Sequence, residues 1–75
     1  MVKIGIIGAG RIGKVHGESI KKYVENAEVK SVADLFLNDS IRKWAAEMGI
    51  PNVYEDYHKI LEDPEIDAVV ICSST

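Results

Sequence analysis

The most informative segment of the sequence is Lys3-Ile4-Gly5-Ile6-Ile7-Gly8-Ala9-Gly10-Arg11-Ile12-Gly13. Its apolar run over residues 2–7 predicts a buried strand that leads directly into Gly8-x-Gly10-x-x-Gly13. Helical periodicity begins at the end of this motif, and an acidic residue, Asp34, follows about 20 residues further on, at the end of a second strand. Glycines cluster in many loops, so the motif alone is a weak signal. Together with the strand before it, the helix after it and the carboxylate of Asp34, the motif indicates a dinucleotide site.

Each glycine of the motif has a physical role in this interpretation. Gly8 allows the tight turn that leaves the strand, and Gly10, which has no Cβ, lets a pyrophosphate approach the backbone. Gly13 lets the first helix pack closely on the strand. The free N–H groups of the loop and the positive end of the helix dipole then face the phosphates. The alternative is a glycine-rich turn between a strand and a helix that binds nothing.

The composition is that of one ordinary soluble domain. Of 75 residues, 47% are hydrophobic and 28% are charged, and the formal net charge is −3 with lysines and arginines scattered along the chain. This distribution argues against nucleic-acid binding, which needs a basic patch, and the apolar runs are too short to span a membrane. A single cysteine, Cys72, excludes an internal disulfide and fits a reducing compartment, so we expect a cytoplasmic protein.

Strands and helices are expected to alternate along the rest of the chain. We predict helices over residues 11–24, 41–48 with cap residues 38–40, and 56–61, and strands over 29–33, 52–54 and 68–72. Alternation implies a parallel sheet, and right-handed crossovers give the strand order 3-2-1-4, with the first two helices on one face and the third on the other. This α/β arrangement is half of a doubly wound Rossmann fold, and it makes residues 1–75 the N-terminal half of a dinucleotide-binding domain.

Several side chains are expected in structural positions. We assign Ile20, Tyr23, Trp44 and Met48 to the core because they recur at helical spacing. The strand over residues 68–72 is a continuous apolar run, which is typical of a strand covered on both faces.

The two histidines and the cysteine are also expected to be structural. We expect His16 to pack or to make a local hydrogen bond, His58 to be solvated on a short polar helix, and Cys72 to be an inert buried thiol.

Four segments of the sequence resemble a known family: residues 4–16, 32–34, 54–57 with 60–61, and 63–75. In order and spacing they are similar to the N-terminal segment of the glucose–fructose oxidoreductase/inositol dehydrogenase (Gfo/Idh/MocA) family, and within it to the inositol 2-dehydrogenases. The family consists of NAD(P)-dependent oxidoreductases that move a hydride between the nicotinamide and a carbon bearing a hydroxyl. The resemblance therefore implies an NAD-binding chain.

The resemblance also implies the residues of the cofactor site. Gly8, Gly10 and Gly13, with the backbone of Arg11 and Ile12, would hold the pyrophosphate. Arg11 would either pair with a phosphate or lie exposed in the first helical turn, and both alternatives stay open.

The other implied contacts lie further along the chain. Asp34 would accept hydrogen bonds from the adenosine ribose hydroxyls and repel a 2′-phosphate, which favours NAD over NADP, or it would only cap the following loop. Leu35 would form a wall of the adenine site. The residues implied along the rest of the dinucleotide are Cys72, Ser73, Ser74 and Thr75.

The family pattern continues beyond these motifs, to a Glu-Lys-Pro motif with a catalytic lysine and to a second α/β domain that binds substrate. The sequence contains neither, so we expect a chain truncated within the Rossmann domain, without a substrate domain and without catalytic residues. No cluster of His, Cys, Asp or Glu has metal-ligand spacing, so no metal is expected.

In this chain the apolar strand over residues 68–72 would be an exposed edge of the sheet, and only the short third helix would cover the face opposite the first two helices. We therefore predict a homodimer through the fourth strand and the uncovered sheet face. Two alternatives to an NAD-binding fragment stay open. One is a self-associating folding fragment without significant ligand binding, and the other is a flavin or S-adenosylmethionine protein on the same half-fold.

Overall fold

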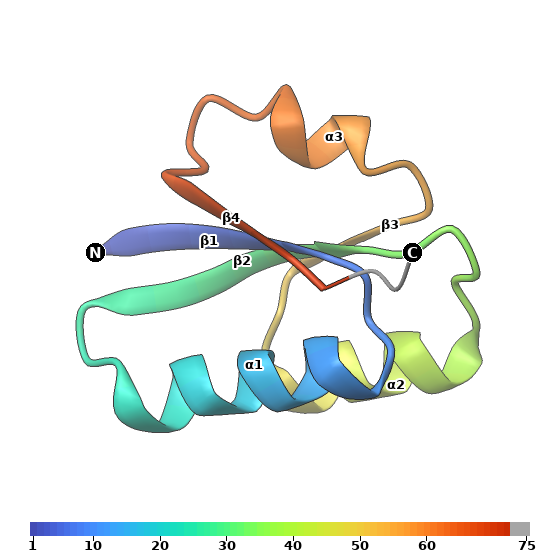
Figure 1. Ribbon diagram of the computed structural model, residues 1–75, viewed down its shortest axis with the longest axis horizontal. Coiled ribbons are helices and arrows are strands. Elements are labelled where there is room, and N and C mark those ends of the chain that lie inside the picture. The colour runs from blue at the N-terminus through green and yellow to red at the C-terminus, as the bar shows by residue number, and fades with distance from the viewer. Residues whose placement is uncertain (73–75) are drawn as a thin grey trace.

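A four-stranded parallel sheet forms the centre of the molecule, with two helices on one face and one helix on the other (Figure 1). The computed structural model describes residues 1–72. The elements in chain order are β1 (Val2–Ile7), α1 (Arg11–Tyr23), β2 (Ala27–Ala33), α2 (Asp39–Met48), β3 (Asn52–Tyr54), α3 (His58–Leu61) and β4 (Ala68–Ile71). The strand order is β3-β2-β1-β4 and every pair is parallel, which confirms the predicted half of a doubly wound fold.

The main core lies between the sheet and the pair α1 and α2. Ile4 and Ile6 of β1 are buried in one cluster with Ile41 and Ala45 of α2, and Ile6 is fully enclosed. These residues repeat every second position in the strand and at i, i+4 in the helix, so each element presents one apolar face to the other. Trp44 and Met48 are half-buried against this cluster, as predicted.

The ends of α2 are set by local chemistry that the sequence indicates. The side-chain oxygen of Asn38 accepts a hydrogen bond from the backbone N–H of Ile41 at 2.9 Å, which satisfies a donor that the helix leaves free. At the other end Gly49 adopts a left-handed conformation with φ of 76°, which favours glycine. Both predicted helix boundaries are confirmed.

The prediction that Tyr23 belongs to the core is wrong, because its side chain is 72% exposed. The inner face of α1 is formed by small residues, Gly13 and Gly17, and by half-buried Ile20. A Cβ on Gly17 would lie 2.9 Å from Cη2 of Trp44, so α1 approaches α2 along its glycines. This close approach fixes the rotation of α1 and turns Tyr23, and also His16, toward solvent.

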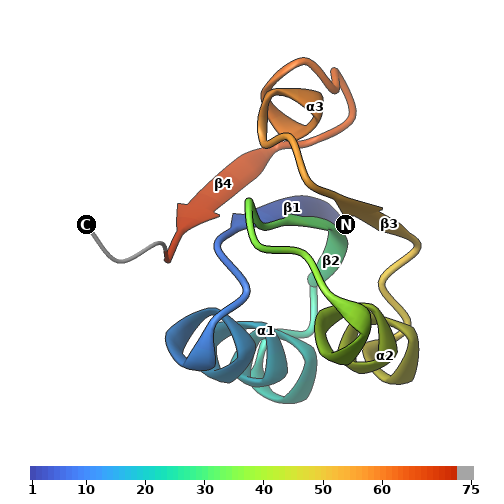
Figure 2. The ribbon, with the colours of Figure 1, turned by 90° about the vertical axis from the view of Figure 1, so that its right-hand side faces the viewer.

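The fourth strand is an exposed edge, as predicted for this chain, although its apolar run taken alone is typical of a strand covered on both faces. In β4, Val69 is 37% exposed and Ile71 is 71% exposed. The strand pairs only with β1, and α3 is a short helix that packs over β1 and β2 instead (Figure 2). In the described part of the chain, β4 is therefore an apolar strand at the edge of the sheet, with no strand paired on its outer side.

Other boundaries differ by one or two residues. β2 begins at Ala27 rather than Val29, because Val2 pairs with Ala27 and donates its N–H to Asn26 O at 2.7 Å. α1 ends at Tyr23 and β4 at Ile71. α3 begins at His58, and the carboxylate of Asp56 accepts the N–H of that residue at 2.9 Å. Among residues 1–72, no helix is long and apolar enough to cross a membrane.

Candidate functional site: a cavity at the carboxyl ends of the strands

A large cavity, about 1130 Å³, opens at the carboxyl ends of the strands. Figure 2 views the molecule from this end, where the loops that follow β1 and β2 lie side by side. Because all four strands are parallel, loops distant in the sequence meet here, which is where ligands bind in open α/β sheets. The lining residues are Ile7, Gly8, Ala9, Gly10, Arg11, Lys14, Ala33, Asp34, Leu35, Phe36, Asn38, Ser40, Ile41, Glu55, Tyr57, Leu61, Ile71 and Cys72.

The glycine loop turns sharply between β1 and α1. Gly8 has φ of 97°, a conformation that side chains rarely adopt, and its N–H donates to Ala33 O at 2.7 Å. A Cβ on Gly13 would collide with the carbonyl oxygen of Gly8, so the first turn of α1 lies directly against the loop. These two glycines are therefore required by the protein's own geometry.

Gly10 differs from the other two glycines of the motif. A Cβ built there would meet no atom within 4 Å, and its φ of −73° is open to any residue. Gly10 is exposed at the wall of the cavity, so the space beside its backbone is free for another molecule. Nothing inside the described part of the chain explains a glycine at this position.

The N-terminus of α1 opens into the cavity without a side-chain cap. Its N-cap is Gly10, no side chain among residues 1–72 is seen to accept a hydrogen bond from its first turn, and that turn contains no acidic residue. The neighbouring helix α2 is different, because Asn38 caps it and Asp39 lies in its first turn. Free N–H groups and the helix dipole attract an anion, so α1 offers a phosphate site that α2 does not.

Asp34 joins the ends of two strands through both carboxylate oxygens. Oδ2 accepts the backbone N–H of Ala9 at 2.8 Å, and Oδ1 accepts the N–H of Phe36 at 2.8 Å. The side chain therefore does cap the loop that follows β2, and it also contacts the glycine loop. A carboxylate has about four acceptor positions, so two bonds leave room for a ligand hydroxyl.

The cavity that contains the Asp34 carboxylate is lined by side chains of both charges. Two cations, Arg11 and Lys14, and two acids, Asp34 and Glu55, line it. Lys14 is half-buried and Arg11 is exposed, and no salt bridge joins either of them to an acid among residues 1–72. The cavity can therefore receive a ligand that carries both phosphates and hydroxyls.

The half-buried thiol of Cys72 lines the far side of the cavity. Its N–H donates to Ile7 O at 2.7 Å, which continues the pairing of β4 with β1. Burial raises the pKa of the thiol above its ordinary value because the thiolate is poorly solvated there. The thiol is therefore protonated at neutral pH, which agrees with the expected inert role.

The structure brings together most of the residues that the sequence singled out. Gly8, Gly10, Arg11, Asp34, Leu35 and Cys72 line the cavity, while Gly13 supports the loop from below. Ile12 lies in the first turn of α1. Ser73, Ser74 and Thr75 lie outside the described residues.

Sequence reasoning missed a second set of lining residues. Its members are polar or aromatic side chains on elements that follow the glycine loop, namely Lys14, Phe36, Asn38, Ser40 and Tyr57. One signal was available for Lys14, since it follows Gly10 by one helical turn on α1. The other residues could be assigned to the cavity only once the order of the parallel strands was known.

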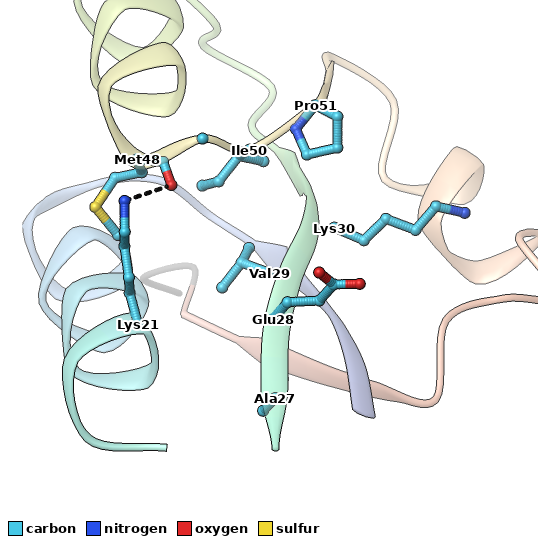
Figure 3. A pocket seen from close by; sticks show the side chains of 9 residues that line it. Lys21, Ala27, Glu28, Val29, Lys30, Met48, Ile50 and Pro51 are labelled. Atoms are coloured by element: carbon cyan, nitrogen blue, oxygen red, sulfur yellow. Dashed lines mark hydrogen bonds between the residues drawn. The ribbon is translucent and has the colours of Figure 1, made fainter. Parts of the chain in front are cut away.

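A second cavity, about 330 Å³, lies at the opposite end of the sheet (Figure 3). It is lined by Lys21 of α1 and by residues 27–30 and 48–51. Lys21 Nζ donates to Met48 O at 3.0 Å across its rim. Among residues 1–72, no group of three His, Cys, Asp or Glu side chains is arranged to hold a metal ion.

The parallel sheet, the glycine loop and the carboxylate at the end of β2 define a dinucleotide-binding protein of the Rossmann class. Residues 2–75 match the family described as "Oxidoreductase family, NAD-binding Rossmann fold", and the chain belongs to this family. The cofactor for which this fold is built is NAD.

Individual relatives agree with this assignment. The chain is 39% identical over 74 residues to myo-inositol 2-dehydrogenase of Thermotoga maritima, covering 99% of the chain and 22% of that relative. The crystal structure of a probable dehydrogenase from Thermotoga maritima superposes with a TM-score of 0.87 at 39% identity, covering 99% of this chain and 22% of that one. Scyllo-inositol dehydrogenase from Lactobacillus casei, with bound NAD(H) and scyllo-inositol, superposes with a TM-score of 0.85 at 32% identity and the same coverage. The chain thus spans about a fifth of the length of the relatives it matches.

Proposed function

We propose that residues 1–75 bind NAD(H) in the cavity at the carboxyl ends of the strands. The pyrophosphate would lie against Gly10 and the free N-terminus of α1, and the adenosine ribose would donate its hydroxyls to Asp34. Leu35 would contact the adenine, and Arg11, Ile12, Gly13 and residues 72–75 would complete the site. A carboxylate beside the ribose repels a 2′-phosphate, so we propose NAD rather than NADP.

The observation that carries this proposal is the open space at Gly10. Within residues 1–72, the glycine is required neither by its backbone conformation nor by a neighbouring atom, and it lies at the uncapped end of a 13-residue helix. A phosphate bound against the backbone there would explain why position 10 is a glycine, because a Cβ would occupy the space of the phosphate.

The test is an NMR titration of the labelled chain with NAD, with Gly10→Ala as the informative variant. We expect saturable shifts in residues 8–14 and 34–36 and an affinity in the high-micromolar to millimolar range, about 4–6 kcal/mol. Gly10→Ala should alter the free energy of unfolding by less than about 1 kcal/mol, because the methyl group meets open space.

The same variant should weaken NAD binding by at least about tenfold, since the methyl group lies where the phosphate would approach. NADP should bind less tightly than NAD. A folded chain that shows no shifts at millimolar NAD would refute the proposal.

The activity that we propose for the whole protein is hydride transfer between the nicotinamide and a hydroxyl-bearing carbon of a polyol or sugar of the inositol type. Supporting this are the family match and the inositol dehydrogenases among the relatives. We propose that residues 1–75 supply cofactor contacts and no catalytic residue. An assay of the 75-residue chain with NAD and inositol should show no turnover, and detectable NADH formation would contradict this assignment.

A second proposal concerns self-association of the 75-residue chain. β4 pairs only with β1, and Val69 and Ile71 are exposed on it, so the strand offers a free edge and an apolar surface. We propose that a second copy adds to this edge and to the sheet face that α3 leaves open. Light scattering at high micromolar concentration should give the mass of a dimer, and a folded monomer would refute it.

We also propose that the protein acts in the cytoplasm. The single cysteine, Cys72, is half-buried and unpaired in the described chain, and this fits a reducing compartment. Fractionation of cells that express the protein should recover it with the cytosolic proteins. Recovery in a secreted or membrane fraction would contradict this location.

A further inference from the structure

The carboxylate of Asp34 is engaged before any ligand arrives. Oδ2 is 2.8 Å from the backbone nitrogen of Ala9, and Oδ1 is 2.8 Å from that of Phe36. Ala9 lies between the two glycines that turn the chain out of β1, and it is 1% exposed. One carboxylate at the end of β2 therefore holds the middle of the glycine loop.

Burial of Ala9 in the core cluster and backbone hydrogen bonds also hold this loop in place. The N–H of Gly8 donates to Ala33 O at 2.7 Å, and the first helical bond runs from Lys14 N to Gly10 O at 3.0 Å. In the described part of the chain, no side chain caps α1 at Gly10. The bond from Ala9 to Asp34 is thus the side-chain contact that ties the loop to the end of β2, and hydrogen bonds to ionised acceptors are stronger than neutral ones.

We infer that Asp34 is a positioning residue for the phosphate half of the site as well as an acceptor for the ribose. This inference rests on the proposed NAD site and extends it. By fixing Ala9, the carboxylate keeps the backbone of Gly10 and the first turn of α1 in the geometry that receives a pyrophosphate. A preorganised loop binds more tightly because less ordering is required when the ligand enters.

The two roles make different predictions for a ligand without ribose hydroxyls. If Asp34 only accepts hydroxyls, its removal leaves the affinity of such a ligand unchanged. If Asp34 also holds the loop, that affinity falls too. The pair of probes is ADP and 2′,3′-dideoxyadenosine 5′-diphosphate, which share the adenine and the pyrophosphate and differ only in the hydroxyls.

The experiment measures the dissociation constants of both probes for the parent chain, Asp34→Ala and Asp34→Asn by NMR titration. We expect Asp34→Ala to weaken binding of the dideoxy probe about five- to tenfold, because the variant loses the hydrogen bond that positions the loop. Binding of ADP should weaken further. Asp34→Asn keeps the size of the side chain and supplies a variant that folds if the alanine does not, with one of the two acceptors replaced by an amide donor.

Asp63 provides a matched control at the other end of the sheet. Its Oδ1 accepts the N–H of Glu65 at 2.9 Å, and its Oδ2 contacts Lys30 Nζ at 2.6 Å. Like Asp34, it is half-buried, bonds a backbone N–H two residues on and reaches across to another strand, yet it does not line the large cavity. Asp63→Ala should lower stability without changing the affinity for either probe.

A second readout follows the loop in the free protein. The amide of Ala9 should exchange with solvent faster in Asp34→Ala than in the parent, measured relative to Ile6 in β1. Unchanged affinity for the dideoxy probe, or an equal loss in Asp34→Ala and Asp63→Ala, would overturn the inference. If the parent chain bound neither probe, the proposed NAD site would fail, and exchange at Ala9 would still decide whether Asp34 holds the loop.

Discussion

Ile60 of α3 lies directly over the backbone of Gly5 in β1. The isoleucine is 1% exposed, and a Cβ built on Gly5 would collide with its Cγ2. The absence of a side chain at Gly5 therefore leaves the space that Ile60 fills. Through this side chain α3 packs on the sheet. The contact matters for the site because Tyr57 and Leu61, on either side of Ile60, line the large cavity.

We therefore expect Gly5→Ala to destabilise the fold by about 1–3 kcal/mol, the usual cost of overpacking a core. Urea denaturation followed by circular dichroism measures this loss. The double variant Gly5→Ala/Ile60→Leu, which removes the branch at Cβ, should recover part of it. A Gly5→Ala chain as stable as the parent would mean that α3 is free to move away.

Lys14 is expected to contribute to dinucleotide affinity through its charge. It lines the cavity half-buried on α1, where an ammonium attracts a phosphate. Lys14→Gln should weaken NAD binding about three- to tenfold at low salt, with a smaller difference near 1 M salt, where charges are screened beyond about 3 Å. Isothermal titration across a salt series measures this effect.

The matched control for Lys14 is Lys22→Gln. Lys22 lies near the far end of the same helix, over the ring of Tyr23, and its substitution causes the same change in net charge. An equal loss of NAD affinity in both variants would assign the effect to overall charge rather than to the cavity.

Stability should fall at acid pH through Asp63. Its hydrogen bond with Lys30 at 2.6 Å, and then that with the N–H of Glu65, lower the pKa of the carboxyl in the folded state. A lowered folded pKa gives a contribution that is present above the unfolded value, about 3.9, and is lost as the pH falls through the folded value.

Asp63→Asn should therefore be less stable than the parent near neutral pH, and the difference should shrink as the pH falls through the lowered folded pKa of Asp63. Urea midpoints measured across the pH range test this. Glu25→Gln, a change in the exposed loop between α1 and β2, is the control. A pH-independent gap between Asp63→Asn and the parent would assign the loss to packing instead.

Ser31 is a buried hydroxyl that makes no hydrogen bond within the described chain. Its side chain is fully enclosed on β2, beside Gly5 where the register between β1 and β2 shifts. An unsatisfied buried polar group is costly, so Ser31→Ala should raise the free energy of unfolding by about 1 kcal/mol. Thermal and urea denaturation measure the change, and a clear loss of stability would show that the hydroxyl has a partner.

Much of this architecture could be predicted from local patterns. The alternation of strands and helices, the Asn38 cap, the left-handed Gly49 and the strand order are all confirmed, because each depends on neighbours along the chain or on the handedness of crossovers. The core assignment of Tyr23 failed because hydrophobic spacing does not reveal how closely two helices approach. Gly13 and Gly17 decided the rotation of α1.

Local sequence alone was enough to identify the glycine loop, the carboxylate that follows the second strand and the class of ligand, since a motif of short range encodes all three. The tertiary structure alone decided that Asp34 contacts Ala9 rather than only its own loop, and that Lys14 and Tyr57 share a cavity with the glycines. The physical reason is the parallel sheet, which gathers the carboxyl ends of all its strands at one edge. Residues separated by tens of positions become neighbours there, and no local pattern records those contacts.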